Sequence, residues 1–298
     1  NNTNYGDYLF WHGLGAKRVV SARELSLSEL SEIRANIPED MEIETFVHGA
    51  MCMAYSGRCL LSSFLTGRDS NRGACTHPCR WKYALCEEKR EGQYFPIEED
   101  ERGTYIFNSR DLCMIEHIPE LCGAGIDSFK VEGRMKTELY VASVARCYRR
   151  AIDDYFESEE LYRENLPLYR EEIRKCTHRE YTTGFFFGRA GADAMIYDSS
   201  TYVKEYTYLG TVVTKEELFS DAKDEELPGA SCPEGFFGLV QKNKFSVGDE
   251  IEIMHADLTN ERARVLEIRD AVSGASMDSC PHAKQRLYVK LEAMPGQG

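Results

Sequence analysis

No stretch of the sequence holds about eighteen consecutive apolar residues, the length that a membrane-spanning helix requires. Positive charge is also scarce. The chain has 36 lysines and arginines against 50 aspartates and glutamates, which gives a net charge of −14. This balance argues against a protein that binds nucleic acids through general electrostatic attraction.

Two motifs of hydrolytic enzymes are absent. The sequence has neither the G-x-S-x-G turn of serine hydrolases nor the H-E-x-x-H helix of zinc peptidases. Among the seven histidines, only His77 lies near a candidate nucleophile, Cys75. Residues two apart do not face each other on a helix, and a triad needs a third group to orient the histidine. Proteolysis therefore finds little support in these residues.

A disulfide framework is not expected either. Eleven cysteines is an odd number, a chain of 298 residues does not need covalent cross-links, and the sequence shows no secretory signal peptide. We therefore expect a reducing compartment and a cytoplasmic protein. Seven of the eleven cysteines fit the pattern of core residues.

The other four cysteines form a cluster in the sequence with the spacing C-x6-C-x15-C-x3-C: Cys52, Cys59, Cys75 and Cys79. Glycine, proline and arginine surround them, as is typical of loops. Thiolates are soft ligands that suit zinc and iron–sulfur clusters. Structural zinc sites usually begin with closer pairs, whereas a larger cluster accepts ligands from several loops. The spacing favours an iron–sulfur cluster, with zinc and unliganded thiols as alternatives.

Cations are concentrated near these cysteines despite the acidic total. Residues 58–90 hold seven lysines and arginines against three acids, and residues 130–150 hold six against two. A basic face of this kind could bind a phosphate or a carboxylate. A solvated surface with internal ion pairs explains the pattern equally well.

Residues 1–178 alternate segments typical of strands with segments typical of helices. The expected strands are residues 17–24, 41–48, 104–108 and 127–132. The expected helices begin after Ser26, near residue 111 (to 118) and at residue 137 (to 156). Such alternation predicts an α/β fold with parallel βαβ units.

Each expected strand ends in charged or ligating groups: Arg23 and Glu24, His48, Asn108 to Arg110, and Glu132 to Arg134. The carboxyl ends of parallel strands lie at one mouth. Taken singly, these residues have plain structural explanations, because Glu132 could pair with Arg134 and His48 could be a structural histidine. Together they favour a polar pocket beside the cysteines.

The pattern changes after the first 178 residues. Residues 179–205 contain an aromatic and glycine-rich stretch, residues 181–188, that reads as a linker packed onto another element. Residues 206–298 contain five short strands separated by polar turns, which predicts a small β-barrel domain. These strands are expected at residues 209–213, 237–241, 249–253, 263–268 and 286–291.

Five stretches of the sequence resemble the peptidase U32 family and follow that family's order. They are residues 44–62 around Cys52 and Cys59, 66–73, 79–83, 108–113 and 130–136. The similarity covers most of residues 1–200, and the β-rich tail resembles the C-terminal domain of longer members. The subgroup that hydroxylates the wobble uridine of tRNA is the most similar.

The resemblance implies a TIM-like (β/α) barrel, of which this chain would hold the second half. It also implies a [4Fe–4S] cluster and the oxygen-independent formation of 5-hydroxyuridine in tRNA. Cys52, Cys59 and Cys75 match the cluster positions best, with Cys79 as the fourth ligand and Cys113 in reserve. Collagenase-like proteolysis is one alternative. A scaffold that holds a cluster and acts with a protein partner, or as a homo-oligomer, is another.

These implications assign roles to the residues at the expected mouth. Glu24 and Glu132 are the candidate proton-transfer groups, and Arg134 is the third candidate catalytic residue. The expected ligands of the tRNA and of a small carboxylate hydroxyl donor are His48, Arg58, Arg72, Arg80, Lys130 and Lys136. The uridine would have to be splayed out, and stacked on Trp81 or on an aromatic residue of 185–187.

Overall fold

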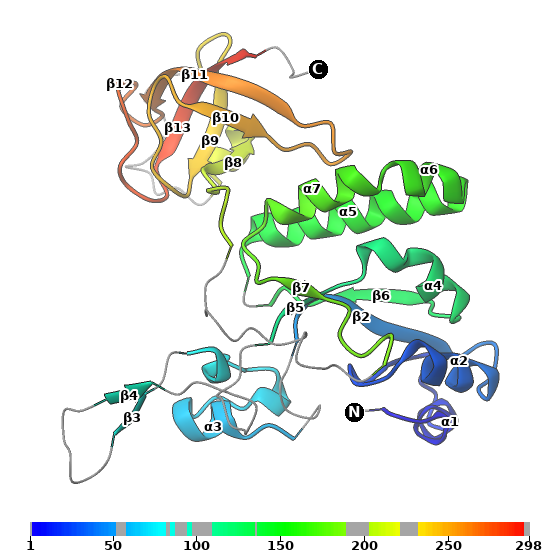
Figure 1. Cartoon of the computed structure of the whole chain (residues 1–298). Coiled ribbons are helices and arrows are strands. Elements are labelled where there is room, and N and C mark those ends of the chain that lie inside the picture. Colours follow the sequence, from blue (N-terminus) through cyan, green and yellow to red (C-terminus); the bar gives the residue numbers. More distant parts are fainter. Residues whose placement is uncertain are drawn as a thin grey trace. The chain divides into compact units, whose positions relative to one another are not determined.

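Figure 1 shows a computed structural model of the chain. It describes residues 2–51, 58–81, 84–86, 94–96, 109–134, 136–188, 203–220 and 232–294. The chain divides into two compact units, Asn1–Glu205 and Tyr206–Gly298. Within the described ranges, no helix is long and apolar enough to cross a bilayer.

The first unit is built around one long strand, β2 (Glu42–Ala50). Strand β1 (Arg18–Val20) pairs with its first residues, and β6 (Ser128–Val131) pairs with Glu44 to His48. Both pairings are parallel. Three of the strands expected from the sequence are therefore present and parallel, whereas expected strand 104–108 lies outside the described residues.

The helix that the sequence predicted over residues 111–118 is wrong at its start, where the structure has a strand, β5 (Asp111–Cys113). It pairs antiparallel with the last three residues of β2, and β7 (Tyr181–Thr182) pairs parallel with β5. The helical turns begin only later, at η3 (Ile115–His117) and α4 (Ile118–Gly123). The free edge at the end of β2 takes up residues 111–113, and this long-range pairing overrides the local pattern. The half-barrel of parallel strands implied by the resemblance is thus not confirmed.

The remaining elements of this unit are mostly helices (Figure 1). They are α1 (Tyr5–Gly13), α2 (Leu27–Ala35), α3 (Leu61–Thr66), η1 (Ser70–Arg72), η2 (Pro78–Arg80), α5 (Glu138–Glu157), α6 (Glu159–Glu164) and α7 (Leu166–Arg174). A short antiparallel pair, β3 (Ala84–Cys86) and β4 (Tyr94–Pro96), lies between η2 and β5 in the chain. The expected capping box is confirmed, because Ser26 and Glu29 bond reciprocally at the start of α2.

Helix α5 packs on the sheet through one face. Its buried residues recur at helical spacing and include Tyr140, Val144, Tyr148 and Ala151. The Tyr148 hydroxyl donates to the Val47 carbonyl at 2.8 Å and accepts from the backbone amide of residue 114 at 3.0 Å. One side chain of α5 therefore holds both β2 and the end of β5.

The expected linker 181–188 belongs to the first unit. Its first two residues form β7, and the Phe186 carbonyl accepts from the Leu27 amide at 2.9 Å. Phe186 is buried. The segment therefore packs onto the start of α2, as the aromatic residues led us to expect.

The second unit is an antiparallel sheet with the strand order β10-β11-β13-β9-β8, and β12 pairs with β11. Its elements are β8 (Gly210–Val213), α8 (Lys215–Leu218), β9 (Phe237–Gln241), β10 (Glu250–Ile253), β11 (Glu261–Asp270), β12 (Ser276–Met277) and β13 (Arg286–Ala293). The five expected strands are confirmed. No pairing joins β10 to β8 among the described strands, so they form a curled sheet in place of the closed barrel that we expected. Its core includes Leu239, Val265, Ile268, Leu287 and Val289.

Candidate functional site

The carboxyl ends of the three parallel strands meet at Arg23. Its guanidinium donates to the Ala50 carbonyl at 2.6 Å, at the end of β2. It also forms an ion pair with Glu132, just after β6, with 2.9 Å between Nη2 and Oε2. The guanidinium carbon lies 3.8 Å from the centre of the Phe46 ring. Arg23 therefore ties the ends of β1, β2 and β6 together.

Gly49 allows β2 and Glu132 to approach closely. A Cβ atom at residue 49 would lie 2.5 Å from the Glu132 carbonyl oxygen, and the φ of Gly49 is +111°. For both reasons, any residue other than glycine at position 49 would be strained. The Glu132 amide donates to the His48 carbonyl at 2.9 Å. Glycine at this position thus sets where the Glu132 carboxylate lies.

Arg134 extends this group of charges toward the cysteines. Its backbone amide donates to Glu132 Oε1 at 3.3 Å. Its guanidinium lies against Gly73, since a Cβ atom there would be 2.8 Å from Nη1 of Arg134. Gly73 precedes Cys75 by two residues. Arg23, Glu132 and Arg134, called the strand-end cluster below, therefore adjoin the segment that carries the cysteines.

The cysteine segment, residues 58–81, is held together by hydroxyl groups. Thr76 contacts two residues of α3: its amide donates to Ser62 Oγ at 3.1 Å, and its hydroxyl lies 3.2 Å from that of Thr66. Ser70 Oγ donates to the Cys59 carbonyl at 2.7 Å. These bonds join α3 to the backbone that carries Cys75, and η1 to the backbone that carries Cys59.

The described cysteines of this segment have the donor chemistry of an iron–sulfur site. Cys59, Cys75 and Cys79 are partly exposed, and the His77 amide donates to Cys75 Sγ at 3.3 Å. Hydrogen bonds from backbone amides to sulfur stabilise negative charge on a thiolate ligand. Cys52 lies outside the described residues. Within those residues, no three Cys, His, Asp or Glu side chains are close enough to hold a metal ion. The residues fit the cluster by chemistry, and the cluster stays a prediction.

The reserve ligand, Cys113, has a different environment. It lies on β5 opposite His48, and burial raises the pKa of its thiol to about 12. A thiol in this state is a core residue unless a metal ion displaces its proton. Cys79, in the partly exposed segment, remains the predicted fourth ligand.

Of the predicted substrate ligands, the two lysines lie beside carboxylates, whereas two arginines of the cysteine segment are exposed. Lys130 forms an ion pair with Glu44 at 2.9 Å, and Lys136 lies 3.9 Å from the buried carboxylate of Asp111. Arg58 and Arg72 are exposed on the cysteine segment. The side chain of Arg80 lies outside the described residues. Glu24 is partly buried, directly after Arg23 in the chain.

His48 lies beneath α5, away from solvent. Its ring is 1% exposed and packs against Tyr148 and Tyr181, with ring centres 5.6 and 5.4 Å away. Burial lowers the pKa of His48 to about 3, so the ring is neutral near pH 7. Its Nε2 has no hydrogen-bond partner in the described part of the chain. This position agrees with a structural histidine, the plain reading of the sequence.

Two of the predicted stacking aromatics have exposed rings. Trp81 is 47% exposed and Phe187 is 56% exposed, whereas Phe186 is buried. The Phe187 ring packs edge-on against His117, with 4.7 Å between the ring centres. Trp81 follows η2 at the end of the cysteine segment, so it is the aromatic residue that best fits a base-stacking role.

Sequence reasoning missed a buried polar group on β5. Asp111 is 1% exposed, and its carboxylate accepts from the Arg179 amide at 3.2 Å. His178 stacks on Tyr181 with 4.3 Å between the ring centres. Asp111 was not predicted as a buried residue because a helix was expected over residues 111–118. The available signal was the charged pair Arg110 and Asp111 directly before an apolar residue.

Comparison with known proteins found one family description that matches the first part of the chain and another that matches the last part. Residues 1–196 match the description "Peptidase family U32", and residues 230–297 match "Peptidase family U32 C-terminal domain". The first match alone covers well over half of the chain.

Three relatives illustrate the range of names in this family. "tRNA hydroxylation protein P" of Escherichia coli is 37% identical over 293 residues, covering 85% of this chain and 60% of the relative. "tRNA hydroxylation protein P1" of Bacillus subtilis is 36% identical over 293 residues, covering 97% and 64%. "Collagenase" of Porphyromonas gingivalis is 30% identical over 262 residues, covering 85% and 58%.

The chain thus spans about three fifths of the length of these relatives. The stretches around the cysteines and the strand-end cluster fall inside the first matched range, and strands β9 to β13 of the second unit fall inside the second. With matches to both the main and the C-terminal regions, the chain belongs to peptidase family U32.

Proposed function

We propose that this protein hydroxylates the wobble uridine of tRNA, without molecular oxygen and with the help of a [4Fe–4S] cluster. The observation that carries the proposal is the similarity, at 36 to 37% identity, to two proteins named for tRNA hydroxylation. The strand-end cluster supports it, because charged groups able to bind and orient a substrate adjoin the cysteine segment.

Cys52, Cys59, Cys75 and Cys79 would hold the cluster, with Cys113 as the alternative fourth ligand. A bound cluster would supply electron transfer. Forming 5-hydroxyuridine replaces the C5 hydrogen by a hydroxyl group, which is a two-electron oxidation of uridine. The hydroxyl donor must therefore be reduced by two electrons, and we propose a small carboxylate for this part.

The chain's own residues would bind, orient and transfer protons. Arg134 would bind a carboxylate or phosphate through its guanidinium. The ion pair with Arg23 holds the Glu132 carboxylate at the strand ends, where it could accept the C5 proton, and Glu24 is the second candidate. Exposed Arg58 and Arg72 would contact RNA phosphates, and Trp81 would stack on the splayed base.

The test is the substitution Arg134→Ala in the intact protein, expressed in a strain that lacks its own tRNA hydroxylation protein. We expect 5-hydroxyuridine in purified tRNA, measured by nucleoside mass spectrometry after anaerobic growth, to fall at least about a hundredfold, as expected when a charged transition-state contact is lost. Iron content should not change.

The matched control is Arg149→Ala, which removes an exposed arginine that pairs with Asp153 on α5. It should leave the modification unchanged. Equal modification by both variants would contradict the role of Arg134. Loss of iron in Arg134→Ala would assign the residue to folding of the cysteine segment.

Proteolysis is the second candidate function, favoured by the family description and by the relative named "Collagenase". The described contact between Cys75 and His77 runs through the His77 backbone amide, which is not the geometry of a thiol and its imidazole base. Cleavage of gelatin by the purified protein, abolished by Cys75→Ala without loss of fold, would establish it.

A third candidate is a scaffold that carries the cluster for a protein partner or within a homo-oligomer. Tagged protein recovered from anaerobic cells distinguishes this function. Modification of tRNA only when a co-purified second subunit is present would support it, whereas activity of the purified chain alone would exclude it.

A further inference from the structure

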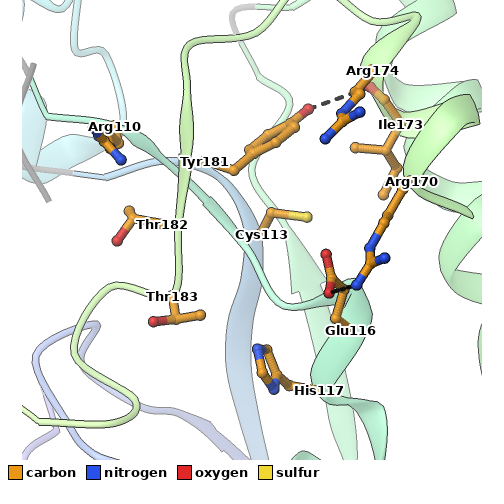
Figure 2. A pocket seen from close by; sticks show the side chains of 10 residues that line it. All are labelled: Arg110, Cys113, Glu116, His117, Arg170, Ile173, Arg174, Tyr181, Thr182 and Thr183. Atoms are coloured by element: carbon orange, nitrogen blue, oxygen red, sulfur yellow. Dashed lines mark hydrogen bonds and ion pairs between the residues drawn. The ribbon is translucent and has the colours of Figure 1, made fainter. Parts of the chain in front are cut away.

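The first unit contains a pocket of about 340 Å³ between β5, β7, η3 and α7 (Figure 2). Three arginines line it: Arg110 precedes β5, and Arg170 and Arg174 lie on α7. None of them belongs to the strand-end cluster or to the cysteine segment. Neither the function proposed above nor the family description assigns a role to this pocket.

The charges of the pocket are only partly compensated. Arg170 forms an ion pair with Glu116, which also lines the pocket. Arg110 pairs at 2.9 Å with Glu180, which does not line it. Arg174 forms no ion pair in the part of the chain that the structure describes. Arg174 is therefore the pocket arginine whose charge no described carboxylate pairs with, and it makes the pocket attractive to anions.

A second observation comes from Arg110. Its Nε is buried and has no hydrogen-bond partner among the described residues, although the guanidinium reaches Glu180 through Nη2. A buried N–H group without a partner is costly, and it is commonly satisfied by a water molecule or a ligand. Arg110 therefore has a donor that a water molecule or a ligand could satisfy.

The rest of the lining consists of His117 and of side chains that are apolar or carry hydroxyl groups. The Tyr181 hydroxyl donates to the Ile173 carbonyl at 3.3 Å, which fixes the aromatic ring beside Arg174 (Figure 2). Ile173 and Cys113 complete this wall. Thr182 accepts from the Gly184 amide at 3.2 Å, so its hydroxyl hydrogen can donate to another group. Apolar side chains together with a few polar donors are the usual composition of a small-molecule site.

We propose that this pocket binds a small organic anion. A carboxylate or phosphate group would face Arg174, next to Arg170 on the same helix, and a short apolar body would pack on Tyr181 and Ile173. Guanidinium groups recognise both kinds of anion with paired hydrogen bonds. The volume is near the lower end for ligand sites, which suits a molecule of a few carbon atoms. The proposal does not rest on the proposed function, because binding is measured without RNA.

The test is isothermal titration of the purified chain with succinate, with glycerol 3-phosphate and with uncharged succinamide. We expect saturable binding of at least one of the two anions and none of succinamide. The anion that binds more tightly identifies the group as a carboxylate or a phosphate. Arg174→Gln should weaken binding by about tenfold or more, since it removes a charged hydrogen-bond donor.

Two further variants make the test independent of folding defects. Glu116→Gln frees Arg170 from its partner, so it should tighten anion binding. Arg163→Gln on α6 is the matched control, because Arg163 is exposed and pairs with Glu159 on the same helix. It should leave affinity unchanged.

Three results would overturn the proposal. One is the absence of saturable binding of either anion up to about 10 mM, the weak end of ligand affinities. Another is equal affinity in Arg174→Gln and Arg163→Gln, with no gain in Glu116→Gln. The third is binding of a short single-stranded RNA that Arg174→Gln abolishes while neither small anion binds, which would assign the pocket to nucleic acid.

Discussion

At the scale of single residues, the candidate site depends on a few positions where the size or charge of the side chain rules out substitution by another residue. Gly49 lets the Glu132 backbone lie against β2, and Gly73 leaves room for the Arg134 guanidinium. Arg23 joins the three strand ends through one carbonyl and one carboxylate. Each of these residues acts on the placement of Glu132 or Arg134, so substitutions there should affect stability and site geometry together.

Gly49→Ala should destabilise the protein by about 2 kcal/mol or more, because it combines a left-handed backbone with a clash against the Glu132 carbonyl. Urea unfolding measures the effect. The control is Gly13→Ala at the end of α1, where a Cβ atom would meet nothing within 4 Å and the φ is not positive. The control should be neutral or slightly stabilising. Equal stability of the two variants would show that β2 and Glu132 do not approach as described.

His48 should make stability depend on pH. Its pKa falls from 6.5 to about 3 on folding because the ring is buried. The unfolded chain therefore binds a proton below pH 6.5 that the folded chain refuses, and stability contributed by the neutral ring is lost as the pH falls from 6.5 toward 3. Above pH 6.5 the contribution is constant. Between pH 6.5 and 5 the loss is about 2 kcal/mol.

His48→Gln should remove this part of the pH dependence, measured as the free energy of unfolding in urea at pH 7, 6 and 5. The variant is less stable at pH 7, yet its curve should be flatter than that of the wild type. His282→Gln, at an exposed position, should leave the curve unchanged. A wild-type slope retained in His48→Gln would mean that another group takes up the proton.

At the scale of elements, α5 connects the sheet to the rest of the first unit. Thr137 caps its first turn by accepting from the Tyr140 amide, and its buried face lies over β2 and β5. Tyr148 is the central residue of that face. Its hydroxyl satisfies one carbonyl and one amide at the place where β5 leaves β2. A side chain far away in the sequence therefore adds to the direct bond from the Met114 amide to the Val47 carbonyl, 3.0 Å long, at this place.

Tyr148→Phe should lower stability by about 1 kcal/mol, since it removes the bonds of the buried hydroxyl while the Met114 amide keeps its own bond to the Val47 carbonyl at 3.0 Å. Thermal unfolding detects this change. Tyr155→Phe on the same helix is the control, because its hydroxyl forms no hydrogen bond within the described residues, and it should be close to neutral. Similar losses in both variants would point to packing of the rings and not to the hydroxyl bonds.

At the scale of the whole molecule, the first unit brings together residues from distant parts of the chain, while the second is a sheet of mostly sequential strands. Strand ends near residues 23, 50 and 132 meet beside the cysteine segment. The arginine-lined pocket combines residues 110 to 117 with residues 170 to 183. Both candidate sites thus depend on the tertiary structure of the first unit.

Iron and acid-labile sulfide in anaerobically purified protein test the cluster. We expect about four of each per chain, lost in Cys75→Ala. Cys79→Ala and Cys113→Ala identify the fourth ligand, because only the variant that lacks the true ligand should lose iron. Cys122→Ala on α4 is the control and should retain it. Intact protein with no iron under these conditions, or full iron content in Cys75→Ala, would contradict the proposed cluster.

The sequence alone determined the features that depend on neighbouring residues. The capping box at Ser26 and Glu29, the helix that follows Thr137 and the five strands after residue 206 arise from contacts a few positions apart or from a local alternation of polar and apolar residues. It also predicted the meeting of Glu132 and Arg134 with the cysteine segment, because parallel strands share one end.

Only the tertiary structure decided the direction of β5, the burial of His48 and the ion pair between Arg23 and Glu132. Each depends on partners about 65 to 109 residues away, which local propensity does not encode. Residues 111–113 carry a pattern compatible with a helix, and the free edge of β2 makes them a strand. The arginine-lined pocket has the same origin, since α7 faces β5 only after the chain has folded.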